Sequence, residues 1–445
     1  MSCASLWTDF SCKDMDKTRV YLERSKTSQI DLRLSRMGSL SPYDPFLKLV
    51  PGAIARVRSL ITFIPPKYLE DVTNHLSCPT PLLKRLDVGI GIAHDEPEPW
   101  RRLTPAPTLA PTLFGGYLSS LRVLCLQSVR TELPWRNMVN LTSFTLGHML
   151  SDVVSIKCLL DFFESAPHLR TVELRSATPT SGAQNGRLVS LACLDKMEIY
   201  GSEPPSLLLD HLLIPAGAKL ATMSSFRGPP VEVNLPRSLD NLRNLSNFTK
   251  IGIHVDDVVS RMQFTGPNGE VLLESMATVV DITSLVLESL SRFDTSNTQW
   301  LRIFCSNPPS RDSPYRTLLP MENLRTLTLV QYTYPDTFIH ALHPGLNHSS
   351  DVVVCPKLEE LAITPLAETV FDTKSMIVMA AARASRGAKL RTVRIACSRG
   401  DLRPRDVLEL RKHVLHVEFG GDQRSDDSDE VSDGSDGVGD SDEED

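Results

Sequence analysis

The sequence has none of the features that mark secreted, membrane-spanning or zinc-binding proteins. Its nine cysteines are scattered, odd in number and free of any Cys-x-x-Cys pair, which argues against a disulfide framework or a zinc site. The first residues hold no basic segment followed by an apolar one, and no window approaches the ~20 apolar residues of a membrane span. We therefore expect a cytoplasmic or nuclear protein, in a reducing compartment, that does not bind a membrane.

An excess of basic residues is also missing. The formal net charge is −7, but the 422–445 segment alone contributes −11, so the rest of the chain carries +4. A nucleic-acid-binding protein would show a basic stripe, so nucleic acid is not an expected partner. The segment from Asp422 to Asp445 is rich in Asp, Ser and Gly, and we predict that it is disordered. Ser428 and Ser441 precede carboxylates and are predicted sites for an acidophilic kinase, although an unmodified solubilising tail explains this segment as well.

Known catalytic motifs are absent as well. There is no Gly-x-Ser-x-Gly elbow, no Gly-rich phosphate loop ending in Lys-Ser/Thr, and no His-Glu-x-x-His. His254, Asp256 and Asp257 would offer an imidazole and two carboxylates to a metal, but they follow a predicted strand, and a polar rim is the better interpretation. The stretch from Gly266 to Gly269 predicts a turn. We predict no catalytic residue, cofactor or metal.

A repeated pattern dominates the sequence. The hexad Leu-x-x-Leu-x-Leu, with other apolar residues allowed, recurs eleven times, at intervals of 20 to 54 residues. The copies occupy residues 83–88, 121–126, 141–146, 169–174, 194–199, 248–253, 282–287, 324–329, 358–363, 390–395 and 414–419. The widest interval leaves room for a degenerate copy at residues 220–223. Most intervals match or exceed the spacing of about 20–29 residues found in leucine-rich repeats.

The hexads predict strands, because each ends in alternating apolar and polar residues. Helical spacing lies between some of them, as in residues 156–167 and 376–384. We therefore predict an α/β fold: an irregular leucine-rich-repeat solenoid with a curved parallel sheet and helices on its convex side. Irregularity is expected because Val129, Met149, Ala177 and Ser202 stand where regular repeats have Asn or Cys, and because Pro-rich insertions interrupt the rhythm.

Side chains that flank the last apolar position of a hexad are expected on the concave face, since side chains alternate across a strand. A protein ligand or substrate would bind there. The best candidates for contact are Glu173, Arg175, Glu198, Tyr200 and Arg394, because Tyr and Arg are enriched at interface centres. For each one taken singly, a solvated strand residue without a partner is the simpler interpretation.

The first forty residues carry a resemblance to a known family. Residues 4–10 (Ala-Ser-Leu-Trp-Thr-Asp-Phe), 20–25 (Val-Tyr-Leu-Glu-Arg-Ser) and 30–34 (Ile-Asp-Leu-Arg-Leu) occur in an order similar to that found downstream of the F-box in fungal, basidiomycete-type F-box proteins with degenerate leucine-rich repeats. Residues 81–86 and Pro134-Trp135 continue the resemblance, although Gln29 replaces a usual Pro. In that family the helical F-box precedes the Leu-Trp element. This sequence starts close to that element, so we expect its F-box to be truncated or missing.

Besides the acidic tail in residues 422–445, which composition predicts, the resemblance implies an F-box-distal helix and first strand in residues 1–40 and degenerate repeats in residues 41–421. It also implies an F-box-like substrate-recognition subunit of a cullin-type ubiquitin ligase. A Skp-type adaptor and a cullin are implied as partners only where the F-box itself is present. The alternative is an acidic-tailed repeat scaffold for basic proteins such as histones, resembling the acidic leucine-rich nuclear phosphoproteins. An enzyme on an unrecognised fold is a third hypothesis, which no group of residues supports.

Overall fold

A computed structural model describes most of the chain. The described residues are 7–11, 15–34, 52–64, 73–74, 76–90, 108–109, 113–116, 118–131, 138–147, 155–176, 186–201, 203–225, 234–236, 238–276, 282–332, 336–346, 352–365, 372–396 and 403–420. The predicted disordered tail, with Ser428 and Ser441, lies outside these ranges.

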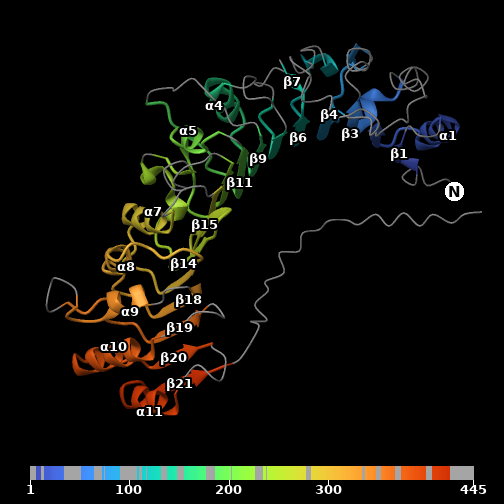
Figure 1. The fold of residues 1–445 in the computed structure, drawn as a ribbon. Helices are drawn as coiled ribbons and strands as arrows, with labels where there is room; N and C mark the ends of the chain where they lie inside the picture. The colour runs from blue at the N-terminus through green and yellow to red at the C-terminus, as the bar shows by residue number, and fades with distance from the viewer. Residues whose placement is uncertain are drawn as a thin grey trace, which may run out of the picture.

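The described chain forms an arc built on one long sheet of seventeen strands (Figure 1). The strands are β1 (Asp9–Ser11), β2 (Ile30–Leu34), β3 (Val57–Ile64), β4 (Arg85–Ile90), β6 (Val123–Gln127), β8 (Ser143–Gly147), β9 (Thr171–Arg175), β11 (Lys196–Gly201), β13 (Lys219–Ser224), β14 (Lys250–Val255), β15 (Val259–Gly266), β16 (Gly269–Met276), β17 (Trp300–Cys305), β18 (Thr326–Tyr332), β19 (Glu360–Pro365), β20 (Thr392–Ile395) and β21 (His416–Phe419). Two short pairs, β5 (Thr108–Leu109) with β7 (Arg130–Thr131) and β10 (Val189–Ser190) with β12 (Leu212–Leu213), form separate sheets.

Helices cover the outer side of the arc and leave the inner side to the strands (Figure 1). The helices are α1 (Met15–Ser25), α4 (Ile156–Ser165), α5 (Ser206–Leu209), α7 (Ile282–Ser289), α8 (Ser313–Leu318), α9 (Asp336–Leu342), α10 (Thr373–Ser385) and α11 (Pro404–His413). The predicted α/β architecture, with a curved and mostly parallel sheet and helices on its convex side, is therefore confirmed at this level.

Strand pairing follows chain order except at one place. From β1 to β13 every neighbouring pair in the sheet is parallel. β13 then pairs with β16 rather than with β14, and β16, β15 and β14 form an antiparallel meander. Parallel order resumes where β14 meets β17 and continues to β21. The sheet is thus parallel with one antiparallel insertion near its middle.

Burial of the hexad side chains explains the strands. In residues 121–126, for example, Leu121, Leu124 and Leu126 have no exposed surface. The first Leu of a hexad also closes a turn, since its backbone N–H donates to the carbonyl three residues earlier. This bond recurs at Leu83, Leu121, Leu141, Leu169, Leu194, Leu324 and Leu358, with lengths of 2.9–3.2 Å. Repetition of both the turn and the strand makes each unit stack on the next.

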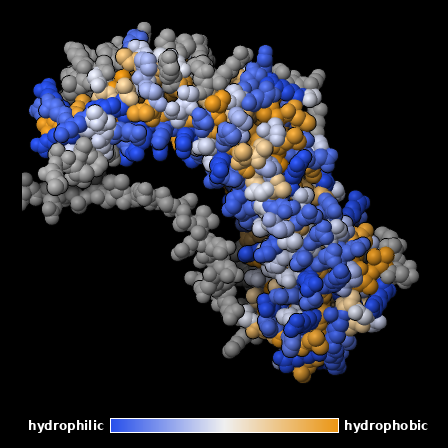
Figure 2. All heavy atoms as spheres, turned by 180° about the vertical axis from the view of Figure 1, so that it is seen from behind, coloured by the Kyte–Doolittle hydropathy of each residue, from blue (hydrophilic) through white to orange (hydrophobic). Residues whose placement is uncertain are grey.

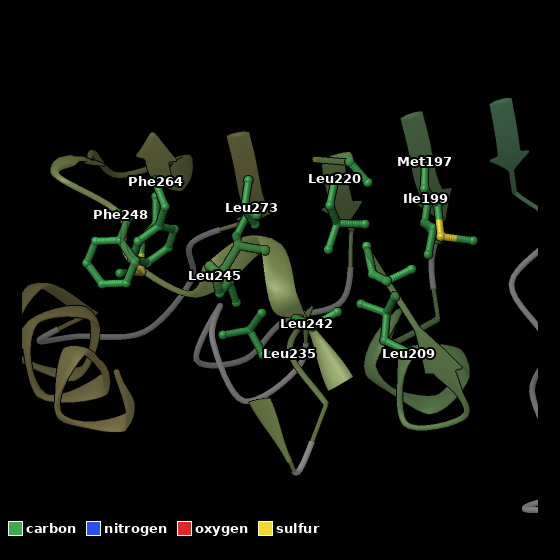
Figure 3. Close-up of a cluster of buried hydrophobic side chains, with 14 of the residues drawn as sticks. Met197, Ile199, Leu209, Leu220, Leu235, Leu242, Leu245, Phe248, Phe264 and Leu273 are labelled. Carbon is green, nitrogen blue, oxygen red and sulfur yellow. The ribbon is translucent and has the colours of Figure 1, made fainter. Parts of the chain in front are cut away.

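The core lies between the sheet and the outer layer. Figure 3 shows Met197, Leu220 and Leu273 on neighbouring strands, with Leu209 and Leu242 in the layer that faces them. In α4, the Ser155 side chain accepts from the Cys158 N–H and begins the helix. The Phe162 ring then packs 4.3 Å from that of Phe144 on β8. α4 thereby covers the strand that precedes it.

One predicted strand is wrong. Residues 282–287 form helix α7, and the strand of that unit is β17, at Trp300–Cys305. The apolar pattern of Ile282, Leu285 and Leu287 also fits a buried helix, because a short apolar run satisfies both periods. The other ten hexads end in strands of the long sheet, and the degenerate copy at residues 220–223 lies within β13. Residues 266–269 make the turn of the β15–β16 hairpin, as predicted.

Candidate functional site on the concave face

Side chains that point away from the core form rows along the concave side of the sheet, because the parallel strands pair in register. Figure 2 shows mainly hydrophilic residues along the inner edge of the arc. The central row on the first half of the sheet contains Asp87, Cys125, Thr145, Glu173 and Glu198. A second row contains Gly89, Gln127, Gly147, Arg175 and Tyr200. The rows bring residues from distant hexads to one surface.

A hollow of about 440 Å³ lies on this surface, across strands β4, β6, β8 and β9. We call it the β4–β9 hollow. Its lining residues are Arg85, Asp87, Val123, Cys125, Gln127, Ser143, Thr145, Gly147, Glu173 and Arg175. Gly147 helps to create the space, since a Cβ at this position would meet only Gln127 at 3.7 Å and Arg175 at 3.8 Å.

Acidic groups form the floor of the β4–β9 hollow, and basic groups form its rim. The Asp87 and Glu173 side chains are 10% and 18% exposed, whereas those of Arg85 and Arg175 are 49% and 57% exposed. Each acid pairs with the arginine two residues away on its own strand, Asp87 with Arg85 at 3.5 Å and Glu173 with Arg175 at 2.5 Å. The Thr145 hydroxyl also donates to Glu173 at 3.3 Å.

The Asp87 carboxylate is incompletely satisfied. Its Oδ2 has the long contact with Arg85, but Oδ1 is buried and has no hydrogen-bond partner among the described residues. An unpaired buried oxygen of this kind is uncommon in folded proteins, because losing its hydration costs about 1–3 kcal/mol. A residue that lines the hollow therefore has a buried carboxylate oxygen without a donor among the described residues.

Two other groups on this surface have raised pKa values, chiefly because they are buried. Burial raises the pKa of the Cys125 thiol to about 11. A Gln127 hydrogen bond opposes this rise, and the Asp87 charge, a hydrogen bond between the thiol and Asp87, and the Glu173 charge add to it. Burial likewise raises the pKa of the Tyr200 hydroxyl to about 12, together with the nearby Glu198 carboxylate. At neutral pH both groups are neutral, so neither adds negative charge to the surface.

The structure brings four of the five predicted contact residues together. Glu173 and Arg175 line the hollow, while Glu198 and Tyr200 lie beside them in register on β11. Glu198 is paired with Lys196 at 2.9 Å. Arg394 is distant: β20 is separated from β11 by seven strands of the sheet, and Arg394 bridges Glu360 and Glu418 at 2.7 Å each.

Asp87 and Arg85 were missed among the predicted contact residues. A usable signal was present, because Asp87 occupies in the 83–88 hexad the position that Glu173 occupies in the 169–174 hexad. Its burial and its unpaired oxygen follow only from the neighbouring strands.

The residues considered as metal ligands are engaged in a turn. His254 contacts Asp256 at 3.1 Å, and its ring stacks on Phe304 with centroids 4.1 Å apart. Asp256 Oδ1 accepts from the backbone N–H groups of Val258 and Val259 at 2.7 Å each. Over the described ranges, no three His, Cys, Asp or Glu side chains are grouped as a metal site would need.

No helix in the described part of the chain has the length and apolar character needed to cross a bilayer.

Comparisons with known proteins give no family. No family model matches the chain, and no curated protein does. One solved structure, a Bacteroides fragilis protein determined as a structural-genomics target, aligns with 76% of this chain and 75% of its own. The two share 10% sequence identity, and the TM-score is 0.22.

Proposed function

We propose that this chain is a protein-binding leucine-rich-repeat protein that uses its concave face to hold a partner. The β4–β9 hollow carries this proposal, because residues from four successive strands converge there and leave a polar space open to the inside of the arc. Concave sheets of repeat proteins commonly serve as extended binding surfaces. Catalysis has no comparable support among the described residues.

The repeat type is supported by the hexads and by the recurring turn that precedes them. The leucine N–H bond to the third preceding carbonyl appears in units far apart in the chain, such as those at Leu83 and Leu358. Asparagines outside the predicted ladder position also tie adjacent units together: Asn140 donates to the Ser119 carbonyl at 2.7 Å, and Asn323 to that of Ser296 at 2.8 Å. These features fit a degenerate form of the repeat.

The partner that this proposal favours is a substrate of a cullin-type ubiquitin ligase, which makes the chain an F-box-like recognition subunit. Support comes from the resemblance of the first residues and from their arrangement. α1 lies between β1 and β2 in the chain, and Trp7 packs 5.0 Å from Tyr21, with Arg24 4.6 Å from the Trp7 ring. Binding to a Skp-type adaptor is proposed for a chain that includes an F-box helix.

A pair of glycine substitutions tests the concave face. Gly147→Trp places an indole in the hollow, whereas Gly252→Trp places one on β14, where a Cβ would meet Gln263 at an ordinary 3.7 Å. Proteins captured from source cells by the affinity-tagged full chain are quantified by mass spectrometry, with each variant beside the wild type. We expect a subset of proteins to be lost with Gly147→Trp and kept with Gly252→Trp. Identical sets for all three chains would contradict the proposal.

The ubiquitin-ligase role has a separate readout. The adaptor and the cullin should co-purify with a chain that carries an F-box helix, and proteins lost from Gly147→Trp should become more abundant in cells that express this variant. If partners that depend on the hollow are captured, but the adaptor does not co-purify and the partners' abundance in cells does not change, the binding function is supported and the ligase role is rejected.

A further inference from the structure

The floor of the β4–β9 hollow is acidic and incompletely satisfied, and this decides what it is suited to bind. We propose that the hollow takes a basic side chain, arginine in preference to lysine, from a partner peptide in which acidic residues flank it. This inference rests on the proposed protein-binding function and specifies the chemistry of the partner.

Asp87 supplies the first step. Its side chain is nine-tenths buried, it lines the hollow, and its Oδ1 has no donor among the residues that the structure describes. A cationic N–H group is the strongest available donor for such an oxygen, since charge-assisted hydrogen bonds are roughly twice as strong as neutral ones. Because Oδ1 is itself buried, the carboxylate must turn about its Cβ–Cγ bond to meet such a donor, and the ligand then removes an existing deficit of the free protein.

The position of Glu173 makes the guanidinium the better fit. Cys125 and Thr145 separate Asp87 from Glu173 in the central row, so the two acids lie three strands, about 14 Å, apart at the backbone. A group seated over Cys125 and Thr145 is therefore between the two carboxylates. Arginine presents five donors in a planar fork and serves several acceptors at once, whereas the ammonium of lysine acts as a point charge.

Rim charges select the neighbours of that side chain. Arg85 and Arg175 are half-exposed and stand on either side of the acidic floor. Carboxylates that flank the basic residue of the peptide would meet these guanidinium groups. An anionic ligand alone would have to enter against Asp87 and Glu173, and an apolar one would leave the Asp87 oxygen without a donor.

Selection from a library of random peptides tests the proposal directly. The full-length chain is the bait, and peptides that also bind Gly147→Trp are subtracted. Because the acidic 422–445 segment is present in both baits, the subtraction removes peptides that bind the tail. We expect the remaining peptides to contain an arginine flanked by acidic residues, and to bind Gly252→Trp as they bind the wild type.

A double-mutant cycle then identifies the contact. The selected peptide is compared with a copy in which citrulline, a neutral isostere, replaces the arginine, and each is titrated by fluorescence anisotropy against wild type and Asp87→Asn. We expect Asp87→Asn to weaken the arginine peptide on the order of tenfold or more and to leave the citrulline peptide nearly unchanged. Glu173→Gln serves as a second variant, and thermal unfolding of each variant verifies that it is folded.

Several results would overturn the inference. Hollow-dependent peptides without a basic residue, or equal affinity for arginine and citrulline, would reject the cationic anchor and leave the protein-binding function intact. Failure to select any hollow-dependent peptide would reject it as well, and the cell-capture comparison of Gly147→Trp with Gly252→Trp would then decide separately whether the face binds proteins.

Discussion

Arg383 offers the sharpest test of how the second half of the solenoid is held together. It lies on α10 and has no exposed surface. Its guanidinium donates to the backbone carbonyls of Val354 and Cys355, at 2.7 and 2.8 Å, in the loop before β19. Burial lowers the pKa of this guanidinium, so the fold disfavours its charge while using its hydrogen bonds. We consider the substitution Arg383→Met, which keeps a long side chain and removes every donor.

The expected loss of stability is the balance of two opposing contributions. Two hydrogen bonds from a charged donor stabilise the fold by roughly 3–6 kcal/mol. Removing the buried cation also removes its desolvation penalty, which is several kcal/mol. The Cys355 carbonyl still accepts from the Leu358 N–H at 3.0 Å, so the Val354 carbonyl is the group that loses its donor. We expect Arg383→Met to lower the free energy of unfolding by about 2 kcal/mol. Arg383→Ala adds a cavity and should lower it by about 4 kcal/mol.

Urea denaturation followed by circular dichroism measures these differences. Arg386→Met, at an exposed position on the same helix end, is the matched control and should change the midpoint little. If Arg383→Met were as stable as the wild type while Arg383→Ala was destabilised, Arg383 would act through its volume alone. The argument from the two carbonyl hydrogen bonds would then be refuted.

Further predictions concern the hairpin, the hollow and the tail. Gly269→Ala should destabilise the fold by about 2 kcal/mol or more, because φ at Gly269 is +132° and a Cβ there would lie 2.8 Å from the Ala218 carbonyl oxygen. The control Gly217→Ala has open space around its Cβ and should leave the thermal unfolding temperature unchanged. Cys125, with a pKa of about 11, should be alkylated slowly at pH 8, where about one thiol in a thousand is ionised. Asp87→Asn removes a negative neighbour, which lowers the pKa of Cys125 and should speed alkylation. An unchanged rate would contradict the influence of Asp87 on this thiol. Deleting residues 422–445 should abolish salt-sensitive binding of histones if the tail holds basic proteins, and unchanged binding would exclude that alternative. An acidophilic kinase should phosphorylate Ser428 and Ser441 in the full chain, and mass spectrometry that finds neither modified would refute that prediction.

Most of the sheet was predictable because one hexad fixes both a turn and a strand. In residues 324–329, Leu324, Leu327 and Leu329 are fully buried, and their spacing can be recognised in the sequence without any knowledge of neighbouring units. The same holds for α4, where a Ser N-cap precedes an apolar helical face. Local pattern and global packing agree in these units.

The middle of the sheet was less predictable, for a physical reason. β15 and β16 alternate in the same way as the other strands, but the tight turn at Gly266 and Gly269 makes them antiparallel, and β14 is displaced from β13 by two strands. Nothing in the period of the pattern distinguishes a hairpin strand from a parallel one. Residues 282–287 show the complementary failure, since their apolar spacing fits both a strand and helix α7.

Contact residues are harder to predict than strands, because their value depends on what their neighbours already satisfy. Beyond β13, two arginines of the sheet have acidic partners on adjacent strands: Arg261 pairs with Glu274 at 2.7 Å, and Arg394 with both Glu360 and Glu418. Asp87 has a long contact with Arg85 on its own strand and a thiol neighbour, Cys125, on the next, and its Oδ1 has no donor among the described residues. A partner that engages Arg394 must compete with existing ion pairs, whereas one that reaches Asp87 adds a hydrogen bond that the free chain lacks. We therefore expect substitutions at Asp87 to change binding more than substitutions at Arg394, although sequence alone ranks Arg394 higher.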